Sequence, residues 1–104
     1  MGIKDILKEE LQNSLRMEHD YAREIARLPR GSLVRKRIKG RLFYYLVLRQ
    51  GPKVKTLYKG RLSRIQIRQY KAGSKRRRRL KEQLSMVKKQ IRYLRSVLRG
   101  RYQV

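Results

Sequence analysis

The chain has 104 residues, a formal net charge of +24 and no cysteine. The length fits one compact domain or a small domain with a projecting helix. Without cysteine, a disulfide framework and a thiolate zinc site are both excluded.

The charge is unevenly distributed along the chain. Residues 1–26 contain four basic and six acidic side chains, whereas residues 27–104 contain 27 basic side chains and a single acid, Glu82. A surface of this kind repels itself and attracts polyanions, of which phosphate chains are the commonest in cells. We therefore expect a near-neutral head and an intensely cationic body.

The first element is predicted to be an amphipathic helix within residues 1–28, running from about Ile3 to Leu28. Apolar residues recur three and four apart, which gives one stripe on a helix. The predicted stripe consists of Ile3, Leu7, Leu11, Leu15, Ala22 and Ile25. Pro29 and Gly31 then end the helix.

The middle of the chain, residues 33–59, is predicted to form a three-stranded antiparallel meander. Residues 33–38, 41–48 and 54–58 are extended runs, and the central run is dense in aromatic and branched side chains. Lys39-Gly40 and Gln50-Gly51-Pro52 supply the two connections. Strand alternation places Leu42, Tyr44, Leu46 and Leu48 on one face and Phe43, Tyr45 and Val47 on the other. At least one of these faces needs a cover, for which the helices are the candidates.

The last element is predicted to be a basic helix over residues 63–99. Ser63-Arg-Ile-Gln66 matches a capping box, and Gly73 lies in a segment that favours a break or kink. From residue 80 the apolar residues alternate four and three apart, as in a coiled-coil seam closed by Gly100. The predicted seam consists of Leu80, Leu84, Val87, Ile91, Leu94 and Leu98.

Two partners for this seam are considered. Packing against the first helix buries both apolar stripes and sets acidic flanks against Lys81, Lys88 and Arg95. A homodimer through the seam residues is the other arrangement. The overall fold class is therefore predicted to be α+β, with a helix, a three-stranded antiparallel sheet and a long basic helix in a single domain over residues 1–104.

The sharpest functional feature is the run Lys75, Arg76, Arg77, Arg78 and Arg79. Its side chains repel one another, so local helix stability does not explain them. Guanidinium groups pair with phosphate oxygens in forked geometry, which favours a phosphate clamp over a solvated charge run or a localisation signal.

Further candidate contacts lie on the sheet and on the last helix. Sheet cations are placed in pairs that share a face, and cations on the last helix form a ridge opposite the seam. The predicted nucleic-acid contacts beyond the run are Arg35, Arg37, Lys53, Lys55, Lys59, Lys88, Arg92 and Arg95, with Tyr58 as a candidate for base stacking. For Phe43, Tyr44 and Tyr45 a core role is favoured.

Signals for catalysis are weak. His19 is the only histidine, and its neighbours Glu18 and Asp20 point in other directions on a helix. No glycine-rich phosphate loop is present. We expect neither enzymatic activity nor a bound metal or cofactor.

One resemblance is carried by residues 28–98. The segments Leu28-Pro-Arg-Gly-Ser-Leu33, Lys39-Gly-Arg-Leu-Phe-Tyr-Tyr-Leu46, Lys53-Val-Lys55 and Tyr58-Lys-Gly60 resemble a family of small uncharacterised prokaryotic proteins. These place a Tyr-rich β-hairpin before a coiled-coil-like C-terminal helix. The hairpin is also similar to the N-terminal β-module of some transposases. The resemblance implies nucleic-acid or mobile-element biology and assigns no mechanism.

The sequence as a whole predicts a non-enzymatic protein that grips the phosphate backbone of nucleic acid, with DNA favoured. An RNA-binding ribosomal or ribonucleoprotein component and a coiled-coil protein-interaction module are the alternatives. The longest apolar run, Leu42–Leu48, is too short to span a bilayer. The expected location is the cytoplasm, in association with a nucleoid or a ribonucleoprotein.

Overall fold

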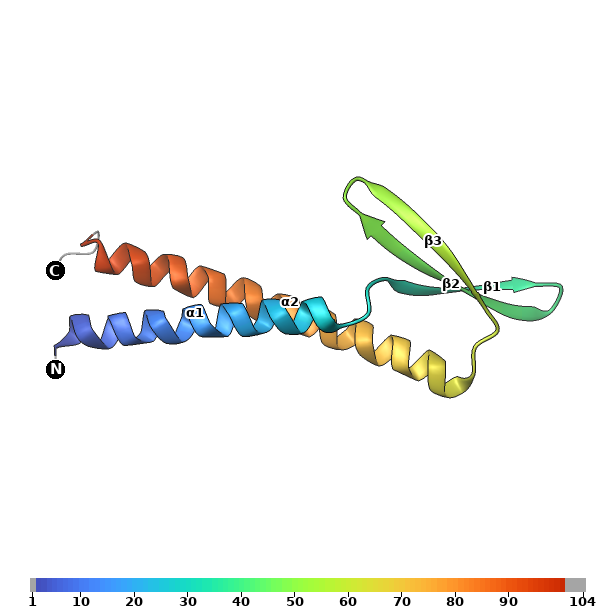
Figure 1. Cartoon of the computed structure of the whole chain (residues 1–104), viewed down its shortest axis with the longest axis horizontal. Coiled ribbons are helices and arrows are strands. Elements are labelled where there is room, and N and C mark those ends of the chain that lie inside the picture. The colour runs from blue at the N-terminus through green and yellow to red at the C-terminus, as the bar shows by residue number, and fades with distance from the viewer. Residues whose placement is uncertain (1, 101–104) are drawn as a thin grey trace. The chain divides into compact units, whose positions relative to one another are not determined.

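The computed structural model describes residues 2–100, so Met1 of the predicted first helix lies outside the described residues. The elements follow the order α1 (Ile3–Arg27), β1 (Ser32–Ile38), β2 (Arg41–Gln50), β3 (Lys53–Gly60) and α2 (Arg64–Leu98) (Figure 1). This confirms the predicted α+β class. The chain divides into two compact units, one built from the two helices and one spanning residues 28–77.

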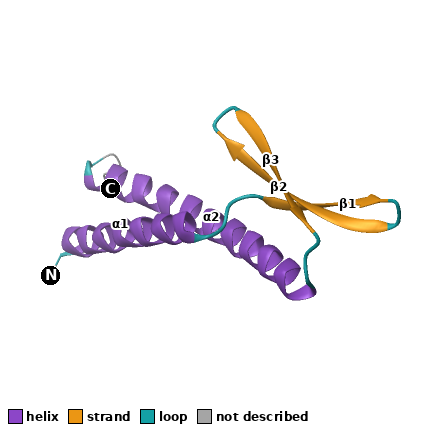
Figure 2. Cartoon of the chain, turned by 45° about the vertical axis from the view of Figure 1, so that its right-hand side comes forward, coloured by secondary structure: helices purple, strands orange, loops and turns teal. Residues whose placement is uncertain are grey.

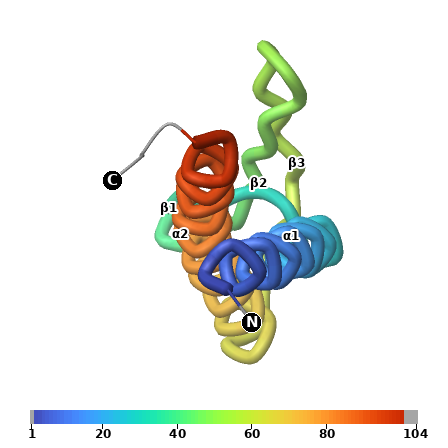
Figure 3. The backbone as a smooth tube through the Cα atoms, turned by 90° about the vertical axis from the view of Figure 1, so that its left-hand side faces the viewer, coloured from blue at the N-terminus to red at the C-terminus, as the bar shows by residue number. Residues whose placement is uncertain are grey.

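The helix-pair unit consists of α1 and the part of α2 from Arg78 onwards. The two segments run side by side in opposite directions (Figures 1 and 3). Leu80, Val87, Ile91 and Leu94 are buried, while Leu84 and Leu98 are half-buried. The seam therefore packs within one chain, as the internal pairing predicted. A homodimer through the same residues would require α1 to leave them, and it stays a prediction.

The predicted stripe on α1 is partly wrong. Ile3 is 76% exposed and Ala22 is exposed, whereas Ser14 is only 2% exposed. The half-buried Leu7, Leu11 and Ile25 belong with Ser14, because these positions continue the same alternation of four and three residues that α2 follows. A seam of this period admits a polar residue where its small side chain lets two helices approach closely, and Ser14 is such a residue.

The sheet has the strand order β1-β2-β3, and both pairs are antiparallel. The first hairpin turns through Lys39 (φ 49°) and Gly40 (φ 77°), and two consecutive positive φ angles are typical of a type I′ turn. The second turns at Gly51 (φ 60°), which precedes Pro52. The meander is confirmed, with strands one or two residues longer at several ends than predicted.

The two outer strands overlap along only part of β2. β1 pairs with residues 41–47 of β2, and β3 pairs with residues 44–50. Three strands therefore lie abreast only at residues 44–47, and the two hairpins extend beyond this centre in opposite directions (Figure 2). A β-bulge opposite Tyr44 and Tyr45 leaves Lys59 without a partner on β2.

Strand alternation separates the two faces of the sheet as predicted. The first face carries Tyr44 (8% exposed) and Leu46 (7% exposed), which form the core of this unit. Gly31 closes over this core, because a Cβ at Gly31 would lie 2.8 Å from Leu48 Cδ2 and 2.9 Å from the Val47 carbonyl oxygen. The Gly31 carbonyl oxygen accepts a hydrogen bond from Ser74 Oγ at 3.3 Å, which ties the loop to α2.

The start of α2 has the predicted capping box. The Ser63 N–H donates to Gln66 Oε1 at 2.9 Å, and the Gln66 N–H donates to Ser63 Oγ at 3.2 Å. Helical structure then continues without a break through Gly73 as far as Leu98, so the break considered at Gly73 does not occur. A turn follows the helix, with Gly100 at a φ of 79° and its N–H donating to the Val97 carbonyl oxygen at 2.9 Å.

Candidate nucleic-acid interface

The sheet brings four predicted contact residues onto one face. The register pairs Arg35 with Tyr44 and Arg37 with Leu42, and it pairs Lys55 with Leu48 and Lys53 with Gln50. Directly paired residues share a face, so all four cations lie on the face that carries Tyr44 and Leu46. The sequence predicted the two pairs separately, and the register adds that they lie on the same face at opposite ends.

None of these cations faces an acid across the sheet. Their cross-strand partners are the uncharged residues Tyr44, Leu42, Leu48 and Gln50. All four cations are exposed, as is Lys59 at the bulge. The positive charge of this face is therefore available to an anion from outside the chain.

The opposite face carries three cations that sequence reasoning did not select as contacts. Lys36 pairs with Phe43, Arg41 with Ile38, and Arg49 with Val54. All three cations are exposed. Strand alternation contained the signal, because it places Lys36, Arg41 and Arg49 on the same face as Phe43, Tyr45 and Val47.

The five side chains of Lys75–Arg79 do not point in one direction. Successive residues of an α-helix are about 100° apart, so five consecutive side chains point to all sides of α2. Lys75, Arg76, Arg78 and Arg79 are exposed, whereas Arg77 is half-buried and its Nε is buried without a hydrogen-bond partner. Arg77 lies three residues before Leu80, at a position that continues the spacing of the seam. Four of the five residues of the predicted clamp are therefore exposed, and the clamp itself stays a prediction.

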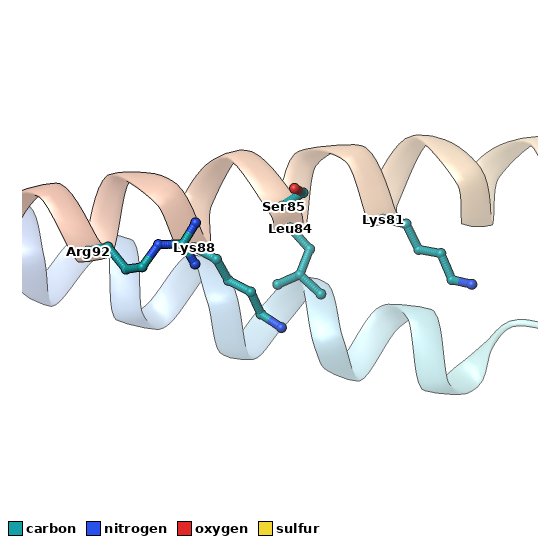
Figure 4. Close-up of a pocket in the computed structure, with 5 residues that line it drawn as sticks. All are labelled: Lys81, Leu84, Ser85, Lys88 and Arg92. Atoms are coloured by element: carbon teal, nitrogen blue, oxygen red, sulfur yellow. The ribbon is translucent and has the colours of Figure 1, made fainter. Parts of the chain in front are cut away.

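A second cluster of cations lies on α2 within the helix-pair unit. An open hollow of about 230 Å³ is lined by Lys81, Leu84, Ser85, Lys88 and Arg92 (Figure 4). The long side chains of Lys81 and Lys88 extend on either side of Leu84. Lys88 and Arg92 were predicted contacts, and Lys81 belongs to the ridge of cations that the sequence predicted on this helix. A comparable hollow on α1, lined by Asp20, Arg23, Glu24 and Arg27, mixes both signs of charge and does not favour an anion.

The cations beside this hollow are regularly spaced. Lys81, Lys88 and Arg95 are seven residues apart, and all are exposed. Seven residues of an α-helix rise by about 10.5 Å. Phosphates recur about every 3.4 Å per strand along the axis of duplex DNA, so this spacing corresponds to about three phosphates.

The stacking candidate Tyr58 lies on the sheet face opposite Tyr44 and Leu46. It is 61% exposed, and its ring contacts the rings of Phe43 and Tyr45. The predicted core roles divide by face: Tyr44 is buried, whereas Phe43 and Tyr45 on the Tyr58 face are only half-buried.

The described part of the chain contains neither a cluster of metal ligands nor a helix suited to span a membrane. Across residues 2–100, no three His, Asp or Glu side chains lie together as metal ligands would. In the same residues, neither helix combines the length and apolar character needed to cross a membrane.

Comparison with known proteins adds no relative. No family model matches the sequence, and neither a curated protein nor a solved structure shows significant similarity to it. The resemblance to small prokaryotic proteins and to the transposase β-module therefore stays a prediction from the residues that carry it.

Proposed function

We propose that this chain is a non-enzymatic protein that binds nucleic acid through the phosphodiester backbone, with DNA as the preferred ligand. The supporting observation is that the exposed cations of residues 27–100 are matched within that segment by a single acid, Glu82. On the sheet, the cross-strand neighbours of the cations are all uncharged or aromatic. Charges arranged in this way are neutralised by an external polyanion.

The contacts are distributed over two surfaces. In the unit of residues 28–77, they are Arg35, Arg37, Lys53, Lys55 and Lys59 on the sheet, with Lys75 and Arg76 on α2. In the helix-pair unit, they are Arg78, Arg79, Lys81, Lys88, Arg92 and Arg95. Side chains of this type on a helix and on hairpins position a protein on phosphates and carry little sequence information. Binding is therefore expected to be strong at low salt and weakly dependent on base sequence.

The test is a salt series with three ligands: duplex DNA, single-stranded DNA and structured RNA of matched length. If about eight cations meet phosphates of duplex DNA, the logarithm of the affinity falls with the logarithm of salt at a slope near −7. The proposal predicts this steep slope and tighter binding to DNA than to RNA at matched salt. A preference for structured RNA would instead assign the protein to a ribonucleoprotein. An affinity that hardly responds to salt would contradict backbone binding for every ligand.

A further inference from the structure

The sheet face that carries Tyr58 contains no fully buried side chain. By register, this face contains Val34, Ile38, Phe43, Tyr45, Val47, Val54 and Tyr58, and we call it the aromatic face. Val34, Ile38, Val54 and Tyr58 are each at least 43% exposed. The buried side chains of the sheet, Tyr44 and Leu46, belong to the other face. Packing within residues 28–77 therefore does not account for the aromatic face.

Three rings gather at the middle of this face. The Tyr58 ring centroid lies 5.3 Å from that of Tyr45 and 6.4 Å from that of Phe43, with interplanar angles of 55° and 32°. Tyr58 is thus the ring shared by both contacts, and it is also the most exposed of the three. Phe43 and Tyr45 contact part of the Tyr58 ring, and the rest of the side chain is exposed to a ligand.

Cations stand at both ends of the rings on the same face. Lys36 and Arg41 lie on the β1–β2 hairpin, and Arg49 lies on the β2–β3 hairpin. Along β2, the nine residues from Arg41 to Arg49 span about 27 Å, because they are separated by eight steps at the usual rise per residue. That length accommodates several nucleotides of an extended single strand, which lies within the range of sites built on small β-domains.

The charges decide what kind of partner fits. A second copy of the chain docked on this face through a two-fold axis would bring Lys36, Arg41 and Arg49 of both copies together without an acid between them, which is unfavourable. A flat aromatic surface flanked by cations suits a partner that combines flat apolar groups with negative charge. Unpaired bases on a phosphate chain have both properties, whereas the bases of a duplex are already stacked on one another.

We propose that the aromatic face binds single-stranded nucleic acid, with unpaired bases stacked on Tyr58 and its neighbouring rings and with phosphates on Lys36, Arg41 and Arg49. This inference rests on the proposed function and specifies the form of its ligand. It also separates two tasks, because the cations of the other face and of α2 hold the backbone of any nucleic acid, while the aromatic face distinguishes an open strand from a duplex.

The test compares Tyr58→Ala, Tyr58→Ile and Tyr58→Phe on a thymine oligonucleotide and on a duplex of equal length. Loss of one stacked base costs about 1–3 kcal/mol, so Tyr58→Ala and Tyr58→Ile are expected to weaken single-strand binding by roughly 5- to 150-fold. Tyr58→Phe keeps the ring and is expected to stay within about threefold of the wild type. Duplex affinity is expected to be unchanged in all three variants. Tyr58→Ile preserves strand propensity, so it tests the ring even where the alanine variant is poorly folded.

Two further measurements complete the design. Tyr93→Ala removes a tyrosine of similar exposure (59%) on α2 and is the matched control, with both affinities expected to be unchanged. Because the chain has no tryptophan, its tyrosine emission can be followed directly, and the thymine oligonucleotide is expected to quench it less in Tyr58→Ile than in the wild type. Equal losses on both ligands, or no loss on either, would overturn the inference while leaving backbone binding intact. Absence of salt-dependent binding to any nucleic acid by the wild type would instead remove the proposed function.

Discussion

The helix-pair unit and the unit of residues 28–77 use their apolar residues differently. In the helix pair, four of the six seam residues of α2 are buried, with Ile91 3% and Leu94 4% exposed. In the sheet, only one of two apolar faces is buried, and the other leaves Tyr58 and Val54 each 61% exposed. Burial explains the residues of the seam. It does not explain those of the aromatic face, and a residue that stability does not explain is a candidate for binding.

The largest effect is expected for the seam. Ile91→Ala removes a buried side chain, and such substitutions lower the free energy of unfolding by about 2–5 kcal/mol. Hydrogen exchange should show that the amides of α1 and of residues 78–98 lose protection far more than those of residues 44–47. Met86→Ala is the control on the same helix, because Met86 is 69% exposed and its loss is expected to cost no more than about 0.5 kcal/mol. Equal losses in both units would show that the chain unfolds as one block.

Gly31→Ala is expected to lower hydrogen-exchange protection in the sheet more than in the helix pair. In Gly31→Ala, the new Cβ would lie within 3.0 Å of Leu46 Cγ and of the Val47 carbonyl oxygen, and the backbone is at a φ of 102° that side chains disfavour. The cost is expected to be about 2–3 kcal/mol, with protection lost first at residues 44–47. At Gly40 (φ 77°) a Cβ meets nothing within 4 Å, so Gly40→Ala carries the backbone strain alone, about 1 kcal/mol. A Gly31→Ala variant as stable as Gly40→Ala would mean that the loop does not close the core.

Removing positive charge from α2 is expected to weaken nucleic-acid binding more than removing the same charge from α1. Replacing Arg76, Arg78 and Arg79 by glutamine is expected to weaken duplex binding at least about tenfold at moderate salt, because three outward cations near the junction of the units are lost. Arg77 is not replaced, because it is half-buried and its replacement would change stability as well as charge. The control replaces Arg16, Arg23 and Arg27 on α1, which removes the same charge where acids are nearby and should change the affinity by about twofold or less. If both triple variants bind alike, net charge alone governs affinity.

The smallest effect is expected at the start of α2. Ser63→Ala removes the hydroxyl that accepts the Gln66 N–H, which costs about 1 kcal/mol. Ser85→Ala, at an exposed position inside the same helix, should instead be slightly stabilising, by about 0.5 kcal/mol, because alanine is the better helix former. Thermal unfolding followed by circular dichroism measures both changes. A loss of the same size in both variants would show that the capping box does not contribute.

Local patterns were sufficient for most of the fold. The two-residue period of residues 41–48, the turn residues Lys39-Gly40 and the capping box at Ser63 each depend on neighbours close in the sequence, and all were predicted correctly. The stripe of α1 was harder to predict, because Ser14 is polar and hydrophobicity gives it no weight. Gly73 was misleading for a related reason: glycine weakens a helix on average, but the packing of its surroundings overrides that preference.

The sequence by itself determined the kinds of element and the cationic character of residues 27–104, because charge and short-range periodicity are properties of composition and spacing. Tertiary structure decided which of two apolar sheet faces is buried, which cation of the Lys75–Arg79 run turns inward, and that Tyr58 meets both Phe43 and Tyr45 across strands. These outcomes depend on register and on contacts between residues distant in the sequence, and no local pattern contains them.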